Sequence, residues 1–412
     1  MKYDIAIIGG GPAGMIAAIH ASELGARVIL LEKNDRLGVK LLLTGGGRCN
    51  ITNKTEDIRE FINQFGKDGK FLFSALNKFG VNNVIDFFEN RGVKTKVEEK
   101  NRVFPKSNSA VEILKALIKA LKEQGVEIKT NAEVKNIVSR NNKIEKIILV
   151  GGEEIEANRY IICTGGKSYP ETGSSGDALK WLKKLGHTIV GPWPALVPII
   201  IKETFVKRLE GLSLKDAKII LYKDNKKVNE RQGEAIFTAT GMSGPIILNL
   251  SKDIAINGAK NFKISIDFKP AQTFGELDLE LQDIFRTNGN KLFKNIFDNF
   301  LPPKFVPVLT ELAKINPEKK VNIITGAERT VLVNLIKNFV LEIKGTEKFE
   351  KAITTAGGVN LAEVDPRSMK SKIVDNLYFA GEIVGLAGPT GGYNLQACWS
   401  TGYLAGESAA KG

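Results

Sequence analysis

Three glycines and one acid near the N-terminus have the types and spacing needed to bind a dinucleotide. Gly9, Gly11 and Gly14 form a G-x-G-x-x-G pattern directly after the apolar residues 5–8. Gly9 permits a tight turn, Gly11 lets backbone N–H groups approach a pyrophosphate, and Gly14 lets the next helix pack closely on the strand. That helix, expected over residues 12–24 and opened by Pro12 and Ala13, directs its positive end at the phosphates.

A second apolar run, residues 28–31, ends in Glu32. A carboxylate at this strand tip can accept both hydroxyls of an adenosine ribose, and it would repel a 2′-phosphate. A turn without a ligand is the alternative interpretation of the glycines. Strand, helix, second strand and acid in register favour dinucleotide binding.

A glycine-rich polar segment, residues 44–53, offers a second set of chemically useful groups. The backbone around Gly45 and Gly46 can lie flat against a planar ligand, and Arg48 and Asn53 provide polar groups beside it. A flexible turn is the alternative. Cys49 is expected to be a buried filler, because no histidine nearby in sequence would activate it.

Two further stretches end in glycine after a buried strand. Residues 160–163 lead to Thr164 and Gly165, whose backbone suits contacts to a dinucleotide, although a simple exit from the strand is the alternative. Residues 376–382 end in Gly381 and Glu382, and a glycine loop precedes a helix that begins near residue 393.

This last stretch predicts a second binding pole at the C-terminal end of the chain. Glu382 can hydrogen-bond a polyol, and the helix N-terminus, with Gly392, Asn394 and Leu395, can stabilise charge on a reduced ring. A helix that only packs on the sheet would leave the glycines unexplained. Two poles at opposite ends of one chain favour FAD, because NAD would not require the second.

The elements between the poles follow the periodicity of the sequence. We expect amphipathic helices over residues 56–92, a hairpin over 93–105 and a helix over 110–124. Strands follow at 126–129, 133–139, 144–150 and 154–157, the last three forming an antiparallel meander. The proline-rich residues 191–198 predict a domain boundary. Short strands over 199–269 indicate a small barrel or sandwich, and residues 274–345 are expected to be mostly helical.

Composition limits the possible classes of protein. The 412 residues suffice for two or three domains. No apolar run approaches the roughly 20 residues of a membrane span, and we expect the N-terminus to enter a strand without a leader. The three cysteines lie far apart, which favours a cytoplasmic location and argues against a dithiol pair or zinc site.

Histidines and net charge narrow the possibilities further. The only two histidines, His20 and His187, nearly exclude His-ligated metals and Ser-His-Asp catalysis. We expect His187 to be an imidazolium at a helix end. The net charge of +13 could indicate nucleic acid, but the lysines are dispersed, which favours an ordinary solvated surface and no nucleic-acid partner.

Several motifs resemble one known family over essentially the whole chain: residues 38–53 (GVKLLLTGGGRCNITN), 102–107 (RVFPKS), 164–177 (TGGKSYPETGSSGD), 237–245 (FTATGMSGP), 355–359 (TAGGV) and 379–394 (FAGEIVGLAGPTGGYN). The chain is similar to the aminoacetone-oxidase-like FAD flavoproteins, NAD(P)/FAD-dependent oxidoreductases that include a bile-acid-pathway member.

The resemblance implies an α/β fold, with a glutathione-reductase-like FAD-binding Rossmann domain, an inserted small β-barrel and a helical insert. The expected boundaries are 1–191 with 350–412 for the FAD-binding domain, 192–270 with 325–349 for the barrel and 271–324 for the helical insert. By position, the expected FAD contacts are Gly9, Gly11, Gly14, Glu32, Lys33, Arg48, Val134 (through its backbone), Thr164, Gly165, Glu382 and Asn394.

Two positions depart from the family pattern, Ala239 where relatives often have His and Gly385 where they often have Asp. Any chemistry that the His or Asp side chain performs in relatives is therefore not expected in this chain. We predict Arg48, Asn53 and Arg102 as residues that orient substrate.

The predicted function is hydride transfer between FAD and a small organic substrate, such as oxidation of an aminoacetone-like amine. One alternative is a reductase of conjugated C=C bonds in steroid-like enones, with NAD(P)H as the transient reductant. A less favoured alternative is a tRNA-modifying flavoprotein. We expect no membrane partner, and the oligomeric state is left open.

Overall fold

Both ends of the chain belong to one folded unit, and the middle of the chain forms another. In the computed structural model, which describes residues 3–297 and 300–412, the first unit is Met1–Ala195 with Phe349–Gly412, and the second is Leu196–Lys348. The finer predicted division of the middle segment, at residues 270 and 325, stays a prediction.

A parallel five-stranded sheet is the frame of the first unit. Its strand order is β19 (Leu377–Phe379), β10 (Ala157–Ile162), β1 (Tyr3–Ile8), β2 (Val28–Leu31) and β6 (Glu127–Lys129). Every neighbouring pair is parallel, so all carboxyl ends meet at one edge. The central strands are nearly continuous apolar runs because both faces of such a sheet are covered. A ligand site is therefore expected at the carboxyl edge.

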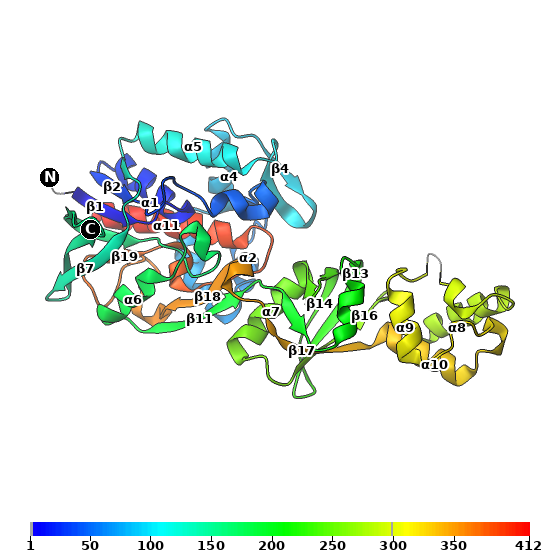
Figure 1. The fold of residues 1–412 in the computed structure, drawn as a ribbon. Coiled ribbons are helices and arrows are strands. Elements are labelled where there is room, and N and C mark those ends of the chain that lie inside the picture. The colour runs from blue at the N-terminus through cyan, green and yellow to red at the C-terminus, as the bar shows by residue number, and fades with distance from the viewer. Residues whose placement is uncertain (1–2, 298–299) are drawn as a thin grey trace. The chain divides into compact units, whose positions relative to one another are not determined.

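The first and last helices of the chain pack against each other. Helix α1 (Pro12–Glu23) is drawn in blue beside the red helix α11 (Tyr393–Lys411) in Figure 1. The contact is close because α11 presents glycines. A Cβ on Gly402 would lie 2.4 Å from the Ala13 carbonyl oxygen, and one on Gly406 would lie 2.5 Å from that of Ala17. Larger residues at these two positions would force the helices apart.

Smaller sheets and helices complete the first unit. The predicted hairpin and meander are present, as β4 (Thr95–Glu98) with β5 (Arg102–Pro105) and as β7 (Val134–Arg140), β8 (Lys143–Leu149) and β9 (Glu154–Ile155). Strand β3 (Thr52–Asn53) pairs with β5, and β11 (Ile189–Ala195) pairs with β18 (Thr354–Val359). The remaining helices are α2 (Ile58–Asn63), α3 (Phe73–Lys78), α4 (Val81–Glu89), α5 (Ala110–Glu123) and α6 (Asp177–Lys184).

The expectation of a charged His187 at a helix end is wrong, because the ring is buried between two partners. Its Nδ1 lies 3.1 Å from Glu363 Oε2, and its Nε2 lies 2.9 Å from Ser371 Oγ. The Ser371 oxygen accepts the N–H groups of Ile373 and Val374, so its own hydrogen goes to Nε2. Burial lowers the pKa of His187, although the hydrogen bond that Nδ1 donates to Glu363 acts in the opposite direction.

This Ser–His–Glu arrangement is structural rather than catalytic. His187 is 2% exposed and Ser371 5%, so no substrate reaches the hydroxyl, and that hydroxyl already accepts two backbone hydrogen bonds. Together the three residues join the start of β11 to the segment before β19.

We predict that His187 makes the folded state sensitive to mild acid. Its pKa in the folded chain lies below the ordinary value of 6.5, so the unfolded chain binds more protons as pH falls below 6.5 and stability decreases. In His187→Gln, the free energy of unfolding should therefore vary less between about pH 6.5 and 5 than in the wild type. Urea unfolding at a series of pH values measures this. Parallel curves for the two proteins would contradict it.

The second unit contains a closed six-stranded barrel, which decides between the two architectures left open by the strand pattern. The order around the barrel is β12 (Ile199–Ile201), β15 (Gly241–Ser243), β14 (Lys226–Phe237), β13 (Ser213–Lys223), β16 (Phe262–Asp267) and β17 (Phe339–Thr346). Helix α7 (Pro245–Asn257) packs on it, and α8 (Phe274–Thr287), α9 (Phe305–Ala313) and α10 (Gly326–Lys337) follow β16.

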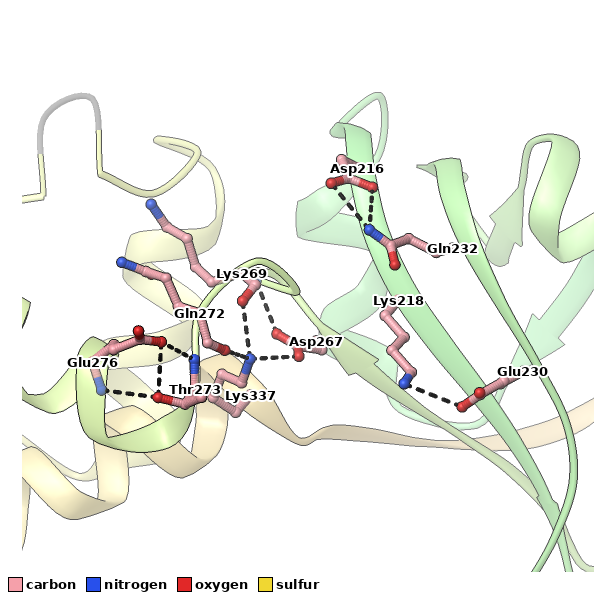
Figure 2. Close-up of polar contacts among 10 residues, drawn as sticks. All are labelled: Asp216, Lys218, Glu230, Gln232, Asp267, Lys269, Gln272, Thr273, Glu276 and Lys337. Carbon is pink, nitrogen blue, oxygen red and sulfur yellow. Dashed lines mark hydrogen bonds and ion pairs between the residues drawn. The ribbon is translucent and has the colours of Figure 1, made fainter. Parts of the chain in front are cut away.

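A buried lysine holds the end of β16 to helices α8 and α10 (Figure 2). The Lys337 ammonium lies 2.6 Å from Asp267 Oδ2 and donates to the carbonyl oxygens of Lys269, at 2.9 Å, and Gln272. Its side chain is only 5% exposed. Next to it, Thr273 and Glu276 form a reciprocal N-terminal cap of α8. All three ammonium hydrogens thus have acceptors, as a buried charge requires.

We predict that Lys337→Met destabilises the protein by about 3 kcal/mol, because it leaves the Asp267 carboxylate and two carbonyl groups without their donor. Chemical unfolding followed by circular dichroism measures the loss. The matched control is Lys202→Met, which breaks an ion pair whose two side chains are each 57% exposed. That variant should change little, because exposed pairs contribute little. Equal effects would contradict the prediction.

Candidate cofactor and active site

One cavity runs along the carboxyl edge of the parallel sheet in the first unit. Its empty space, including the open solvent at its mouth, is about 1280 Å³. Its lining comes from the turn after β1, the end of β2, residues 38–44, the start of β7, the end of β10 and the start of α11. Segments from both ends of the chain therefore share one site.

The glycine turn has the geometry that a pyrophosphate requires. Gly9 has φ +107°, and a Cβ there would lie 2.5 Å from the Cys163 carbonyl oxygen. A Cβ on Gly14 would lie 1.9 Å from the Gly9 carbonyl oxygen, so this glycine allows the close packing of helix on strand. A Cβ on Gly11 would meet nothing within 4 Å, and its space belongs to the cavity. The turn at Gly9 and the close packing at Gly14 match the roles predicted from the spacing, and the pyrophosphate contact of Gly11 stays a prediction.

Glu32 lies at the tip of β2, where its carboxylate is held by two backbone groups. Oε2 accepts the N–H of Gly10 at 2.8 Å, and Oε1 accepts that of Asn34 at 2.9 Å. Each oxygen keeps a second lone pair for a ligand hydroxyl. The neighbouring Lys33 donates to Ser175 Oγ at 2.6 Å and lies 3.3 Å from Asp177, which fixes the wall of the cavity at this end.

A buried hydroxyl at the end of β10 provides a direct test of whether this cavity fits a polar ligand. Thr164 Oγ1 is buried and has no hydrogen-bond partner among the described residues, and Thr164 lines the cavity. Such a group is costly without a partner. A polar ligand lying along the sheet edge would supply one, so the residues present fit a dinucleotide.

At the opposite end, Glu382 makes contacts that sequence reasoning did not anticipate. Its Oε2 lies 2.9 Å from Lys40 Nζ, while Oε1 accepts hydrogen bonds from Ser168 Oγ at 3.0 Å and Thr355 N at 2.6 Å. The carboxylate was expected to bind a polyol, but most of its acceptor capacity goes to the protein. Burial would raise the pKa of Glu382, but the Lys40 charge and these hydrogen bonds hold it below its ordinary value.

Asn394 organises the glycine loop before α11. Its Oδ1 accepts the Gly388 N–H at 2.8 Å, and its Nδ2 donates to the carbonyl oxygens of Gly388 and Pro389. The side chain lines the cavity but is already hydrogen-bonded, so its amide shapes the loop and the helix N-terminus.

The three residues predicted to orient substrate lie together, but none lines this cavity. Arg48 and Arg102 flank the ring of Phe104, with guanidinium carbons 3.9 and 5.9 Å from its centre. Arg48 also pairs with Glu98 at 3.0 Å. The Asn53 amide donates to the carbonyl oxygens of Lys100 and Gly391. These local partners account for the side chains, and a role toward substrate stays a prediction.

The predicted cofactor-contact residues divide into two groups. Those that line the cavity are Gly9, Gly11, Pro12, Ala13, Glu32, Lys33, Val134, Thr164, Gly165, Gly381, Glu382, Asn394 and Leu395. Those outside its lining are Gly14, Gly45, Gly46, Arg48 and Gly392. Lys40, Ser168 and Thr355 were missed. Each belongs to a motif noted in the sequence, but its contact with Glu382 joins segments that are far apart in the chain.

Thiol chemistry and metal chemistry have no support in the described part of the chain. Cys163 and Cys398 line the cavity, and burial raises the pKa of both thiols, that of Cys398 to about 12. Burial likewise raises the pKa of Cys49 to about 12. Among residues 3–297 and 300–412, no cluster of three His, Cys, Asp or Glu residues is placed to hold a metal. Across the same residues, no helix is long and apolar enough to cross a membrane.

The family model described as HI0933-like protein Rossmann domain matches residues 3–408. The chain belongs to this family. A 3-dehydro-bile acid delta(4,6)-reductase of Clostridium scindens is 33% identical over 99% of this chain and 99% of its own length. A ribosomal RNA dihydrouridine synthase of Escherichia coli is 27% identical over 98% of both chains.

Solved structures of similar fold include a 3-ketosteroid-delta4-(5alpha)-dehydrogenase from Rhodococcus jostii, with a TM-score of 0.55 and 15% identity, covering 100% of this chain and 97% of the other. A flavocytochrome c3 fumarate reductase has a TM-score of 0.54 and 17% identity. The match covers 100% of this chain and 78% of the other. At these identities the likeness concerns the fold alone.

Family membership confirms the predicted resemblance, the α/β fold class with its barrel and helical insertion, and the prediction of an FAD-dependent oxidoreductase. The cavity fits the cofactor. Glu32 and the glycine turn would hold its adenosine diphosphate, and the end at Glu382 would then lie toward its flavin.

We predict that Gly11→Val weakens FAD binding by more than about tenfold without unfolding the protein. The valine side chain would occupy space that the pyrophosphate needs, while φ −80° suits any residue and no protein atom lies within 4 Å of its Cβ. Titration of the apoprotein with FAD, followed by flavin fluorescence, measures the affinity. The control Gly151→Ala also meets no atom and should bind normally. Wild-type affinity in Gly11→Val would contradict the predicted pyrophosphate site.

Proposed function

We propose that this protein uses FAD to reduce a carbon–carbon double bond conjugated to a carbonyl group in a small organic substrate. The main support is that full-length relatives have names denoting hydrogen addition to such a bond, a bile acid delta(4,6)-reductase and a dihydrouridine synthase. This proposal favours the predicted alternative over oxidation of an aminoacetone-like amine, which remains a prediction.

The residues of the cavity suit hydride transfer. Bound FAD would supply the hydride-transfer chemistry, with NAD(P)H as the proposed reductant. In the net reaction, NAD(P)H gives up a hydride, the β carbon of the substrate gains it, and a proton from solvent completes the α carbon. Glu32 and Lys33 would anchor the adenosine end, while apolar side chains such as Leu41, Ile353 and Leu395 would keep much of the wall dry.

We predict that the reduced flavoprotein transfers its electrons to conjugated enones. The flavin is first reduced anaerobically with NADH or NADPH, then mixed with a 4-en-3-oxo steroid, and its absorbance is followed by stopped flow. Reoxidation should be fast with the enone and absent with the matched saturated 3-oxo steroid. A flavin that both steroids leave reduced would contradict the proposal.

A second candidate substrate is uridine in RNA, favoured by the full-length dihydrouridine synthase relatives and by the net charge of +13. This candidate competes with the predicted absence of a nucleic-acid partner, which stays a prediction. Ribosomal RNA replaces the steroid as one arm of the same assay, with product analysis for dihydrouridine. Aminoacetone, added to the oxidised enzyme without oxygen, forms another arm, in which bleaching of the flavin would support amine oxidation.

We also propose a cytoplasmic location, supported by the three unpaired cysteines, Cys49, Cys163 and Cys398.

A further inference from the structure

We propose that the ion pair of Lys40 and Glu382 is a positioning device that sets the reduction potential of the bound flavin, an inference that rests on the FAD site of the proposed function. Both residues line the cavity, and Glu382 follows β19, which lies three strands away from β2, the strand whose tip carries Glu32, the residue proposed to bind adenosine.

The pair is built into the wall rather than free on a surface. Lys40 Nζ lies 2.9 Å from Glu382 Oε2 and 2.6 Å from Ser168 Oγ. Ser168 in turn donates to Glu382 Oε1 at 3.0 Å, which closes a ring of three polar side chains. The side chains of Lys40 and Glu382 are 22% and 13% exposed, and Ser168 is fully buried.

The backbone around the pair keeps this ring in place. Thr355 donates its N–H to Glu382 Oε1 at 2.6 Å, and its hydroxyl oxygen accepts the N–H groups of Lys167 and Ser168. Gly166 must lack a side chain, because a Cβ there would lie 2.4 Å from Thr355 Oγ1 and 2.8 Å from Glu382 Oε1. The carboxylate and the ammonium are therefore held in one geometry, as electrostatic preorganisation requires.

The consequence for a flavin follows from charge. Reduction adds electrons to the ring, so a nearby cation favours the reduced form and a nearby anion favours the oxidised form. In a partly buried wall, such interactions are weakly screened. The intact pair is nearly neutral, and it balances the two effects. Removal of one partner leaves the charge of the other uncompensated.

The test compares the flavin reduction potentials of Lys40→Met, Glu382→Gln and the double variant, each by equilibration with a reference dye. Lys40→Met should lower the potential, and Glu382→Gln should raise it. Each should change the ratio of reduced to oxidised flavin about tenfold at a fixed potential, which is about 30 mV for a two-electron couple. The double variant should lie near the wild type.

A merely structural role would not produce shifts of opposite sign that cancel. The matched control is Lys146→Met, which breaks the Lys146–Glu154 pair at 2.7 Å outside the cavity lining and should leave the potential unchanged. Unchanged potentials in both single variants, or shifts of the same sign, would overturn the inference. If Lys40→Met fails to hold FAD, the potential of Glu382→Gln decides. A potential above that of the wild type would support the inference, and an unchanged or lower potential would overturn it.

FAD titration precedes these measurements and distinguishes a failure of the proposed function from a failure of the proposed role of the ion pair. Wild-type protein that binds no FAD would overturn the proposed function. Wild-type protein that binds FAD, with variants of unaltered potential, would overturn only the role of the pair.

Discussion

The site depends on hydrogen bonding between strands that are far apart in the chain. Strand β10 lies between β1, from the N-terminus, and β19, from the C-terminal segment, and all three are parallel. Because parallel strands end at the same edge, the glycine turn after β1, Thr164 after β10 and Glu382 after β19 come to line one cavity. The close packing of α1 on α11, permitted by Gly402 and Gly406, places the second helix N-terminus there as well.

The insertion of the second unit does not interrupt this frame. The chain leaves the first unit after Ala195 and re-enters it at Phe349. Ala195 is paired with Thr354 in the antiparallel sheet of β11 and β18, so the two connections are held close together. A barrel and its helices can therefore fold as their own unit around a separate apolar core, while the parallel sheet of the first unit stays continuous.

Features that depend on neighbours in the sequence could be predicted, and those that depend on distant partners could not. The roles of Gly9, Gly11 and Gly14 follow from backbone sterics within one turn, and the structure shows the expected close approaches at Gly9 and Gly14. Glu382 was recognised as an acid at a strand tip, but its partner Lys40 is separated from it by almost the whole chain. The prediction for His187 was wrong for the same reason, since the local sequence indicated a helix end, whereas in the structure the ring is buried between Glu363 and Ser371 and burial lowers its pKa.

The contacts of Glu382 change the charge that the C-terminal binding pole is expected to present to a ligand. An acid that only accepted hydroxyl groups from a ligand would bring an uncompensated negative charge beside a ring that becomes more negative when it is reduced. The Lys40 ammonium removes this conflict, and Ser168 and Thr355 N–H use the other carboxylate oxygen. Thr355 belongs to β18, the strand by which the chain returns from the second unit. The same short strand thus fixes the point of insertion and the charge balance of the cavity wall.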